Sequence, residues 1–219
     1  MRALYLPKIF SDQAGNGMHL HLSVNRDGKN LFRNEDNPFE LTGEAASFVA
    51  GILEHLPGLM ALSATNPNSY ERLAENCWAG VYSCWGYDNK EAPLRVTRSL
   101  TGLNTVEYKT PDQFSNIYLL LAAVIGAGMD GVKRGLELPE AEQENPASLD
   151  EEYRQNRGIH RLPESVEEAL EAFENDQFLL DLFGKERVKA YLTVKRFELD
   201  HFNKLETLEE FVDTVLYRQ

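Results

Sequence analysis

The chain has 219 residues, of which 42% are hydrophobic and 26% are charged, values typical of a folded protein with one domain or two small ones. Its formal net charge is −13 and no segment forms a basic stripe, which argues against a nucleic-acid-binding protein. The longest nearly apolar run, 117–129, is too short to span a bilayer, and two cysteines make no disulfide framework. We therefore expect a cytoplasmic protein with reduced thiols and no membrane partner.

The first strongly patterned segment is 15–23, with the sequence Gly-Asn-Gly-Met-His-Leu-His-Leu-Ser. Alternate side chains of a strand point to opposite faces, so His19, His21 and Ser23 share one face of the predicted strand. Gly15 and the glycine two residues later permit another group to approach the backbone closely. The pattern is typical of a metal or phosphate site on a sheet, and an ordinary half-exposed strand with two histidines fits it equally well.

The next elements alternate between strand and helix. A hairpin is predicted through residues 25–32, and apolar residues at helical spacing predict a helix over 42–64 with an irregularity at Pro57. Three later elements follow from their own patterns: strands at 93–97 and 104–109, and a buried helix at about 115–134.

The last third of the chain is polar and helical. Residues 137–163 are acidic and interrupted by prolines, which predicts a mobile or peripheral segment. A capping box at Ser165–Glu168 predicts a helix that reaches residue 180, and a second box at Thr207–Glu210 predicts another helix. Together the elements predict an α+β fold, in which helices back an antiparallel sheet and a helical tail follows.

Positive charge gathers in one part of this acidic chain. Five cations lie between residues 72 and 109, namely Arg72, Lys90, Arg95, Arg98 and Lys109. In the strand predicted at 104–109, Thr105, Glu107 and Lys109 face the same way. Such a set is large enough to bind a small anion, and scattered surface charge is the alternative explanation.

Several motifs, taken in order, closely resemble the catalytic domain of the glutamine synthetase family. They are Gly-x-Gly-Met-His-x-His at 15–21, Asn-Ser-Tyr-Glu-Arg at 68–72, Trp-Gly-Tyr-Asp-Asn-Lys at 85–90, Val-Glu-Tyr-Lys at 106–109 and Asn-Ile-Tyr-Leu at 116–119. Each motif is weak alone, but their order and spacing are specific. The resemblance extends from Pro7 to Lys133 and continues more loosely through the tail.

The resemblance implies an ATP-dependent ligase. Members of this family use ATP and divalent metals to phosphorylate the side-chain carboxylate of glutamate, and then transfer it to ammonia or an amine. It implies Mg²⁺ or Mn²⁺ as cofactor, glutamate and ammonia or a small amine as substrates, and a homo-oligomer for the full-length protein. By position, it implies His19 and Glu107 as metal ligands, His21, Ser23, Lys90 and Arg95 as nucleotide contacts, Gly15, Arg72 and Lys109 as substrate contacts, and Arg95 and Arg72 as catalytic cations.

Departures from the ammonia-using pattern concern the substrate side. Lys90 and Lys109 stand where arginine is usual, and lysine cannot form a bidentate pair with an anion. Trp78 stands where ammonia-using members carry a glutamate that helps to shape the ammonium site. Loss of that carboxylate removes an electrostatic trap for a cation and adds apolar surface. The chain is therefore closer in pattern to relatives that join glutamate to amines, or to relatives whose substrate is not settled.

Family members have an N-terminal domain and early catalytic strands that supply further glutamate ligands, and no carboxylate pair precedes Gly15. We therefore interpret residues 1–219 as the C-terminal portion of such a catalytic domain, without the N-terminal domain and the early strands, and expect the isolated chain to be inactive. Two other hypotheses remain. The parent protein is a non-catalytic scaffold or sensor of the same family, or it is another phosphotransferase, such as a guanidino kinase relative, that shares only the fold.

Overall fold

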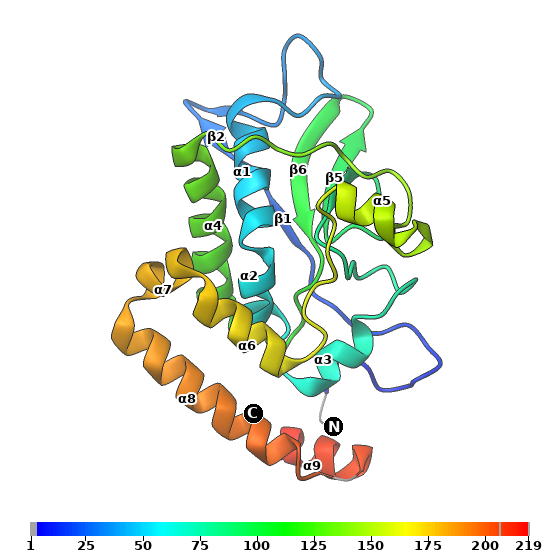
Figure 1. Ribbon diagram of the computed structural model, residues 1–219, viewed down its shortest axis with the longest axis vertical. Coiled ribbons are helices and arrows are strands. Elements are labelled where there is room, and N and C mark those ends of the chain that lie inside the picture. Colours follow the sequence, from blue (N-terminus) through cyan, green and yellow to red (C-terminus); the bar gives the residue numbers. More distant parts are fainter. Residues whose placement is uncertain (1–3, 206, 219) are drawn as a thin grey trace.

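The computed structural model describes residues 4–205 and 207–218. Its centre is a four-stranded sheet in the order β1-β6-β5-β4 (Figure 1). The strands are β1 (Leu20–Leu22), β4 (Trp85–Tyr87), β5 (Leu94–Ser99) and β6 (Gly102–Tyr108). β6 runs antiparallel to both β1 and β5, and β4 joins β5 in parallel at one edge. The expected α+β fold is confirmed, with one parallel pair added to the antiparallel strands.

The predicted hairpin is present beside this sheet. It joins β2 (Asn25–Arg26) to β3 (Lys29–Asn30) through Asp27 and Gly28. Both turn residues have positive φ angles, 50° and 77°, as a two-residue type I′ turn requires. The Asp-Gly sequence favours this turn because glycine adopts the left-handed region without steric cost.

One face of the sheet is apolar and contributes to the main core. Leu94, Val96, Val106 and Tyr108 alternate along β5 and β6, and each is fully buried. They belong to the same core as the inward side chains of α1 (Gly43–Glu54), α2 (Leu56–Ser63) and α4 (Ile117–Arg134). The opposite face of the sheet carries the polar side chains, because strand residues alternate between faces.

The helix predicted at 42–64 is two helices, α1 and α2, bent by 69°. The bend falls at His55, close to the predicted irregularity at Pro57, and proline is well tolerated in the first turn of α2. α1 packs very closely on α4, since a Cβ atom on Gly51 would lie only 2.2 Å from the carbonyl oxygen of Ala127. No single helix among the described residues is long and apolar enough to cross a membrane; α1 and α2 pass that test only as a bent pair.

The remaining helices are α3 (Pro67–Arg72), η1 (Pro146–Ser148), α5 (Glu151–Asn156), α6 (Val166–Asn175), α7 (Gln177–Phe183), α8 (Lys185–Phe202) and α9 (Leu208–Arg218). Among them, α3 and α6 to α9 gather at one end of the molecule, whereas α5 lies near β5 (Figure 1). Both predicted capping residues accept the expected hydrogen bond, Ser165 Oγ from Glu168 N at 3.1 Å and Thr207 Oγ1 from Glu210 N at 3.2 Å. The first helix ends at residue 175 rather than 180, because Asp176 starts α7 as its N-cap.

Residues 137–163 are mostly at the surface, as expected of a peripheral segment, but they are docked against β4. Trp85 Nε1 donates to the carbonyl oxygen of Pro139 at 2.7 Å, and the Asn89 amide donates to the carbonyl oxygens of Glu142 and Glu144 at 2.8 and 2.9 Å. Glu142 is itself buried. The acidic composition suggested a solvated segment, whereas its backbone groups are satisfied by side chains in and next to β4.

Candidate functional site

The candidate site is centred on Glu107, near the C-terminal end of β6. The strand register places His21 of β1 and Arg95 of β5 directly opposite Glu107 on either side. Residues directly opposite in an antiparallel pair lie on the same face, so the three side chains form one row across the sheet. We call His19, His21, Arg95 and Glu107 the Glu107 cluster.

Three groups converge on the Glu107 carboxylate. His19 Nδ1 lies 2.7 Å and His21 Nε2 lies 3.5 Å from Oε1, and Arg95 Nε donates to Oε2 at 2.6 Å. The Glu107 side chain is only 3% exposed, whereas those of His19 and His21 are 40% and 53% exposed. The cluster therefore has a buried anionic floor and an accessible imidazole rim.

The ionisation of Glu107 follows from these contacts. Burial by itself raises the pKa of this carboxyl, but the hydrogen bond from His19 and the positive charge of Arg95 outweigh burial and lower the pKa to about 2. Glu107 is therefore a carboxylate at neutral pH. A carboxylate and an imidazole are donors that Mn²⁺ accepts, and Mg²⁺ favours the carboxylate over the imidazole. The donor set thus fits a divalent cation.

Ser23 lies beyond the end of β1, on the side of the hairpin. Its Oγ accepts a hydrogen bond from Asn25 Nδ2 at 3.2 Å, in an exposed setting. His19, His21 and Ser23 are exposed and the leucines between them are partly buried, which agrees with the predicted shared face. Ser23 is exposed, so its hydroxyl is accessible.

Arg72 and Gly15 are brought together, as the sequence resemblance implied, but the guanidinium is buried. Its Nη2 donates to the carbonyl oxygens of Thr110 and, at 3.2 Å, Pro111. A Cβ atom on Gly15 would lie 2.5 Å from Arg72 Cγ, and one on Gly17 would lie 2.5 Å from Arg72 Nη1. A side chain at Gly15 would also lie 2.5 Å from the carbonyl oxygen of Pro7, so glycine is needed there, and at Gly17 the turn passes over the end of the arginine side chain.

The two lysines differ in exposure. Lys109 is buried, and its Nζ donates to the carbonyl oxygen of Lys90, whose own side chain is exposed. Burial and the nearby charge of Arg95 lower the pKa of Lys109 to about 8. In this structure Lys109 therefore supports the backbone at Lys90, and its role in substrate binding stays a prediction.

Sequence reasoning assigned no role to Asp112, which is fully buried near Arg72. Its Oδ1 accepts from Phe114 N at 2.9 Å, while Asp112 Oδ2 and Arg72 Nε have no hydrogen-bond partner among the described residues. Burial raises the pKa of this carboxyl, and the charge of Arg72 opposes that rise. The Pro-Asp pair after β6 was the available signal, since a short polar residue after proline favours a turn.

Trp78 lies on a strained loop at the surface. Trp78 is 61% exposed, and its φ angle of 59° is unusual for a bulky residue. The backbone N–H of Trp78 donates to Glu91 Oε1 at 3.3 Å, which connects this loop to the segment that carries Lys90. The indole is therefore available to a ligand and is not part of the core.

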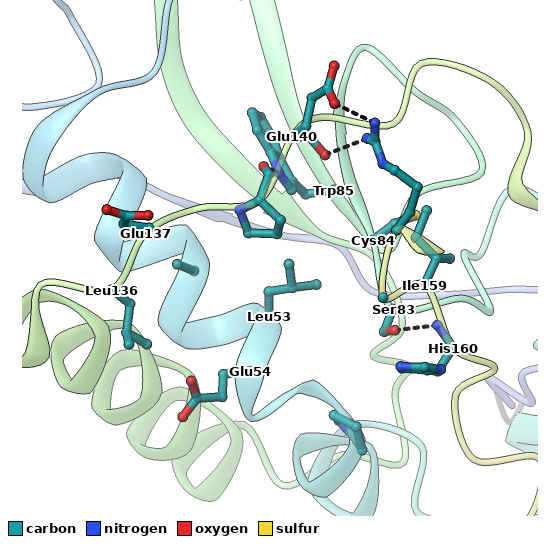
Figure 2. Close-up of a pocket in the computed structure, with 15 residues that line it drawn as sticks. Leu53, Glu54, Ser83, Cys84, Trp85, Leu136, Glu137, Glu140, Ile159 and His160 are labelled. Carbon is teal, nitrogen blue, oxygen red and sulfur yellow. Dashed lines mark hydrogen bonds and ion pairs between the residues drawn. The ribbon is translucent and has the colours of Figure 1, made fainter. Parts of the chain in front are cut away.

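A separate cavity of about 370 Å³ lies between α1, the start of β4 and the segments 136–140 and 157–160 (Figure 2). Leu53 of α1, Trp85 of β4 and Ile159 contribute to its largely apolar wall. Arg157 at its edge is paired with Glu140 at 2.5 Å. None of the predicted site residues lines this cavity, so it is distinct from the Glu107 cluster.

The chain was compared with known proteins. The sequence model of the glutamine synthetase catalytic domain matches residues 1–212. A gamma-glutamylpolyamine synthetase, GlnA3 of Streptomyces coelicolor, is 40% identical over 199 residues, which are 89% of this chain and 43% of that protein. The glutamine synthetase of Pyrococcus horikoshii is 38% identical over 182 residues, 83% of this chain and 40% of that protein.

Solved structures agree with this fold. A GmaS/ADP complex, in its conformation 1, has a TM-score of 0.79 and 27% identity, covering 98% of this chain and 49% of that one. The glutamine synthetase of Plasmodium falciparum has a TM-score of 0.77 and 24% identity, covering 95% and 48%. The chain therefore spans about half the length of the relatives it matches. By the extent of the family match and the shared fold, it belongs to the glutamine synthetase family, within the catalytic domain.

Proposed function

We propose that the protein to which this chain belongs is an ATP-dependent ligase that joins the side-chain carboxylate of glutamate to ammonia or a small amine. The observation that best supports this proposal is that His19, His21 and Arg95 converge on the ionised Glu107, on the polar face of the sheet. In this reaction the glutamate carboxylate attacks the γ-phosphorus of ATP and ADP leaves. The amine nitrogen then attacks the acyl carbon, phosphate leaves, and the nitrogen loses a proton.

His19 and Glu107 would hold a divalent cation, Mg²⁺ or Mn²⁺. When bound, such a cation screens phosphate charge and orients the transferring group. The contribution of the chain is a carboxylate that stays ionised, since its pKa is about 2, and an imidazole already directed toward it. Two protein donors hold a metal weakly. This is why we propose that residues 1–219 are the C-terminal portion of a catalytic domain and that the isolated chain is inactive.

The nucleotide and glutamate would lie on either side of this centre. Arg95 is permanently charged and partly exposed, so it is suited to stabilise negative charge on the transferring phosphate. His21, Ser23 and Lys90 supply accessible polar groups for the nucleotide. The solved GmaS structure of similar fold is a complex with ADP, which supports nucleotide binding by this fold.

Glutamate binding involves the turn over Arg72. Gly15 would present its backbone to the substrate, and Arg72 would act by fixing that turn through its close contact with Gly15 and Gly17. Lys109 completes the predicted substrate set by supporting the backbone at Lys90. We propose Arg72 as a positioning residue in this structure, because its guanidinium is bonded to backbone carbonyls.

The exposed Trp78 favours an organic amine as the acceptor. An indole face attracts a protonated amine by a cation–π interaction and provides apolar surface for its carbon chain. The relative named gamma-glutamylpolyamine synthetase supports the same choice, and the relatives named glutamine synthetase support ammonia as the alternative. A homo-oligomeric assembly and a cytoplasmic location remain part of the proposal.

The test is phosphate release by the full-length protein with ATP, Mg²⁺ or Mn²⁺, glutamate and either ammonium or a diamine. We expect release that requires both glutamate and an amine, and that is lost in His19→Ala but kept in His160→Ala, a variant of an exposed histidine outside the cluster. Nucleotide binding without any turnover would favour the non-catalytic scaffold and overturn the ligase. Transfer from ATP to a guanidine compound would indicate the other phosphotransferase class.

A further inference from the structure

A second histidine lies in a different part of the molecule, at the bend between α1 and α2. The side chain of His55 is 6% exposed. The ring of Phe178, from α7, stacks on the imidazole with 4.7 Å between ring centroids. Sequence patterns assigned this histidine no function, and the proposed ligase chemistry does not use it.

Both ring nitrogens of His55 face carboxylate oxygens. Nδ1 lies 2.7 Å from Asp176 Oδ2, and Nε2 lies 3.2 Å from Asp130 Oδ2. An ionised carboxylate only accepts hydrogen bonds, and a neutral imidazole has only one N–H group. Both contacts are hydrogen bonds at the same time only if the imidazole carries protons on both nitrogens.

The charged groups around His55 come from each element that packs against it. Glu54 lies on α1, Asp130 and Arg134 lie on α4, and Asp176 joins α6 to α7. Arg134 Nη1 lies 2.5 Å from Glu54 Oε1 and 2.8 Å from Asp130 Oδ2. We call these five residues the His55 cluster. Its three carboxylates exceed its one arginine, so a positive charge on His55 improves the local balance.

The effect of these neighbours on the pKa of His55 also favours the protonated ring. Burial lowers the pKa of His55, but the hydrogen bond and charge of Asp176, together with Asp130 and Glu54, outweigh burial and raise it above the ordinary value of 6.5. Asp176 is also held in place, because its Oδ1 accepts from Leu179 N at 3.0 Å and caps α7. The position of the Asp176 carboxylate is therefore set by the α7 cap as well as by its contact with His55.

We propose that His55 is a protonated connection that joins the α1–α2 bend to α4 and to the α6–α7 junction, and that this connection weakens when the imidazole loses a proton as the pH rises. In the neutral ring one nitrogen has a lone pair that faces a carboxylate oxygen, so one contact becomes repulsive. Three helical segments far apart in the sequence thus depend on one proton. The proposal does not rest on the ligase activity.

Glu54, His55 and Asp130 also lie close enough together to suggest a metal site. We do not infer a metal, because Arg134 already supplies a cation to Glu54 and Asp130. Metal binding at these three residues is therefore tested as a second part of the experiment.

The test is an NMR titration of the five histidine rings of this chain, with His55 assigned by loss of its signal in His55→Gln. We expect the His55 midpoint to lie above pH 6.5. In Asp176→Asn the amide keeps an acceptor for the α7 cap and can donate to Nδ1, so a neutral ring is fully satisfied. We therefore expect its midpoint to fall by at least about one pH unit, a tenfold change in the protonation equilibrium, while that of the exposed His160 stays unchanged.

A midpoint at or below pH 6.5 in the unsubstituted chain would overturn the proposal, whether or not the variant folds. An unchanged midpoint in a folded Asp176→Asn would do the same. In the second part, Zn²⁺ is added and the thermal midpoint is measured. No increase is expected, and an increase that EDTA reverses and Asp130→Asn abolishes would replace the proton with a metal and overturn it.

Discussion

The Glu107 cluster and the His55 cluster are built from the same side-chain types in opposite proportions. In the first, two imidazoles and one arginine surround a single carboxylate, and the histidines are 40% and 53% exposed. In the second, three carboxylates surround one imidazole and one arginine, and that imidazole is 6% exposed. The comparison indicates that exposure, more than residue type, separates groups that can exchange partners with a ligand from groups that hold helices together.

Removal of one histidine from each cluster should destabilise the chain by different amounts. His55→Ala removes the ion-pair partner of Asp176 and one of the two partners of Asp130, whose side chains are only 13% and 15% exposed, and this costs about 3–5 kcal/mol. His19→Ala should cost below about 1 kcal/mol because its ring is 40% exposed and Arg95 still pairs with Glu107. Urea denaturation of the chain at about pH 6 measures both. Equal losses would contradict the division between the clusters.

Neutralising one carboxylate in each cluster should separate them in activity. Glu107→Gln removes the charge that we propose binds the cation, and turnover of the full-length ligase should fall by about 10²–10³-fold. Asp176→Asn, a similar change in the His55 cluster, should leave turnover within about twofold at about pH 6. Phosphate release under saturating ATP is the measurement. Normal turnover in Glu107→Gln would show that Glu107 is not part of the active site.

The clusters should lose their stabilisation at opposite ends of the pH range. The folded pKa of Glu107 is about 2, below its ordinary value of 4.5, so its contribution is present above pH 4.5 and is lost as the pH falls toward 2. The folded pKa of His55 is raised, so its contribution is present below pH 6.5 and is lost as the pH rises through the folded value.

The measurement is the stability of the native chain minus that of Glu107→Gln, and minus that of Asp176→Asn, as a function of pH. The first difference should shrink in acid by up to about 3 kcal/mol, and the second should shrink in alkali. Two differences with the same pH slope would show that one cluster has been assigned the wrong charge state.

The smallest expected effect concerns Trp78, which lies outside both clusters. If the indole receives a protonated amine, Trp78→Leu should raise the KM for a diamine about two- to fivefold, the value of an exposed cation–π contact. The KM for ATP and the stability of the chain should not change, because the residue is 61% exposed. An unchanged KM for the diamine would argue for ammonia as the acceptor.

Much of the Glu107 cluster was predictable from the sequence. Alternation along two strands placed His19 and His21 on one face and Glu107 on another strand's polar face, and the family resemblance connected them across 88 residues. The apolar faces of both strands must meet the core, which places the three side chains on the same face of the sheet but does not set the strand direction. The burial of Arg72 and Lys109 was not predictable, because long charged side chains show the same local pattern whether they face solvent or lie beneath a glycine turn.

The sequence alone determined the local elements: the Asp-Gly hairpin, the capped starts of α6 and α9, the helix α4 and the two-faced strands of the sheet. The expectation that α4 is a buried helix holds for one face only, since Tyr118 and Ile125 are exposed. The local elements depend on contacts within a few residues, where sterics and side-chain periodicity suffice. Only the tertiary structure decided that β4 pairs in parallel with β5, that residues 137–163 dock against β4, and which groups surround His55. The partners of His55 lie 75 and 121 residues away, and no local pattern encodes a distance of that kind.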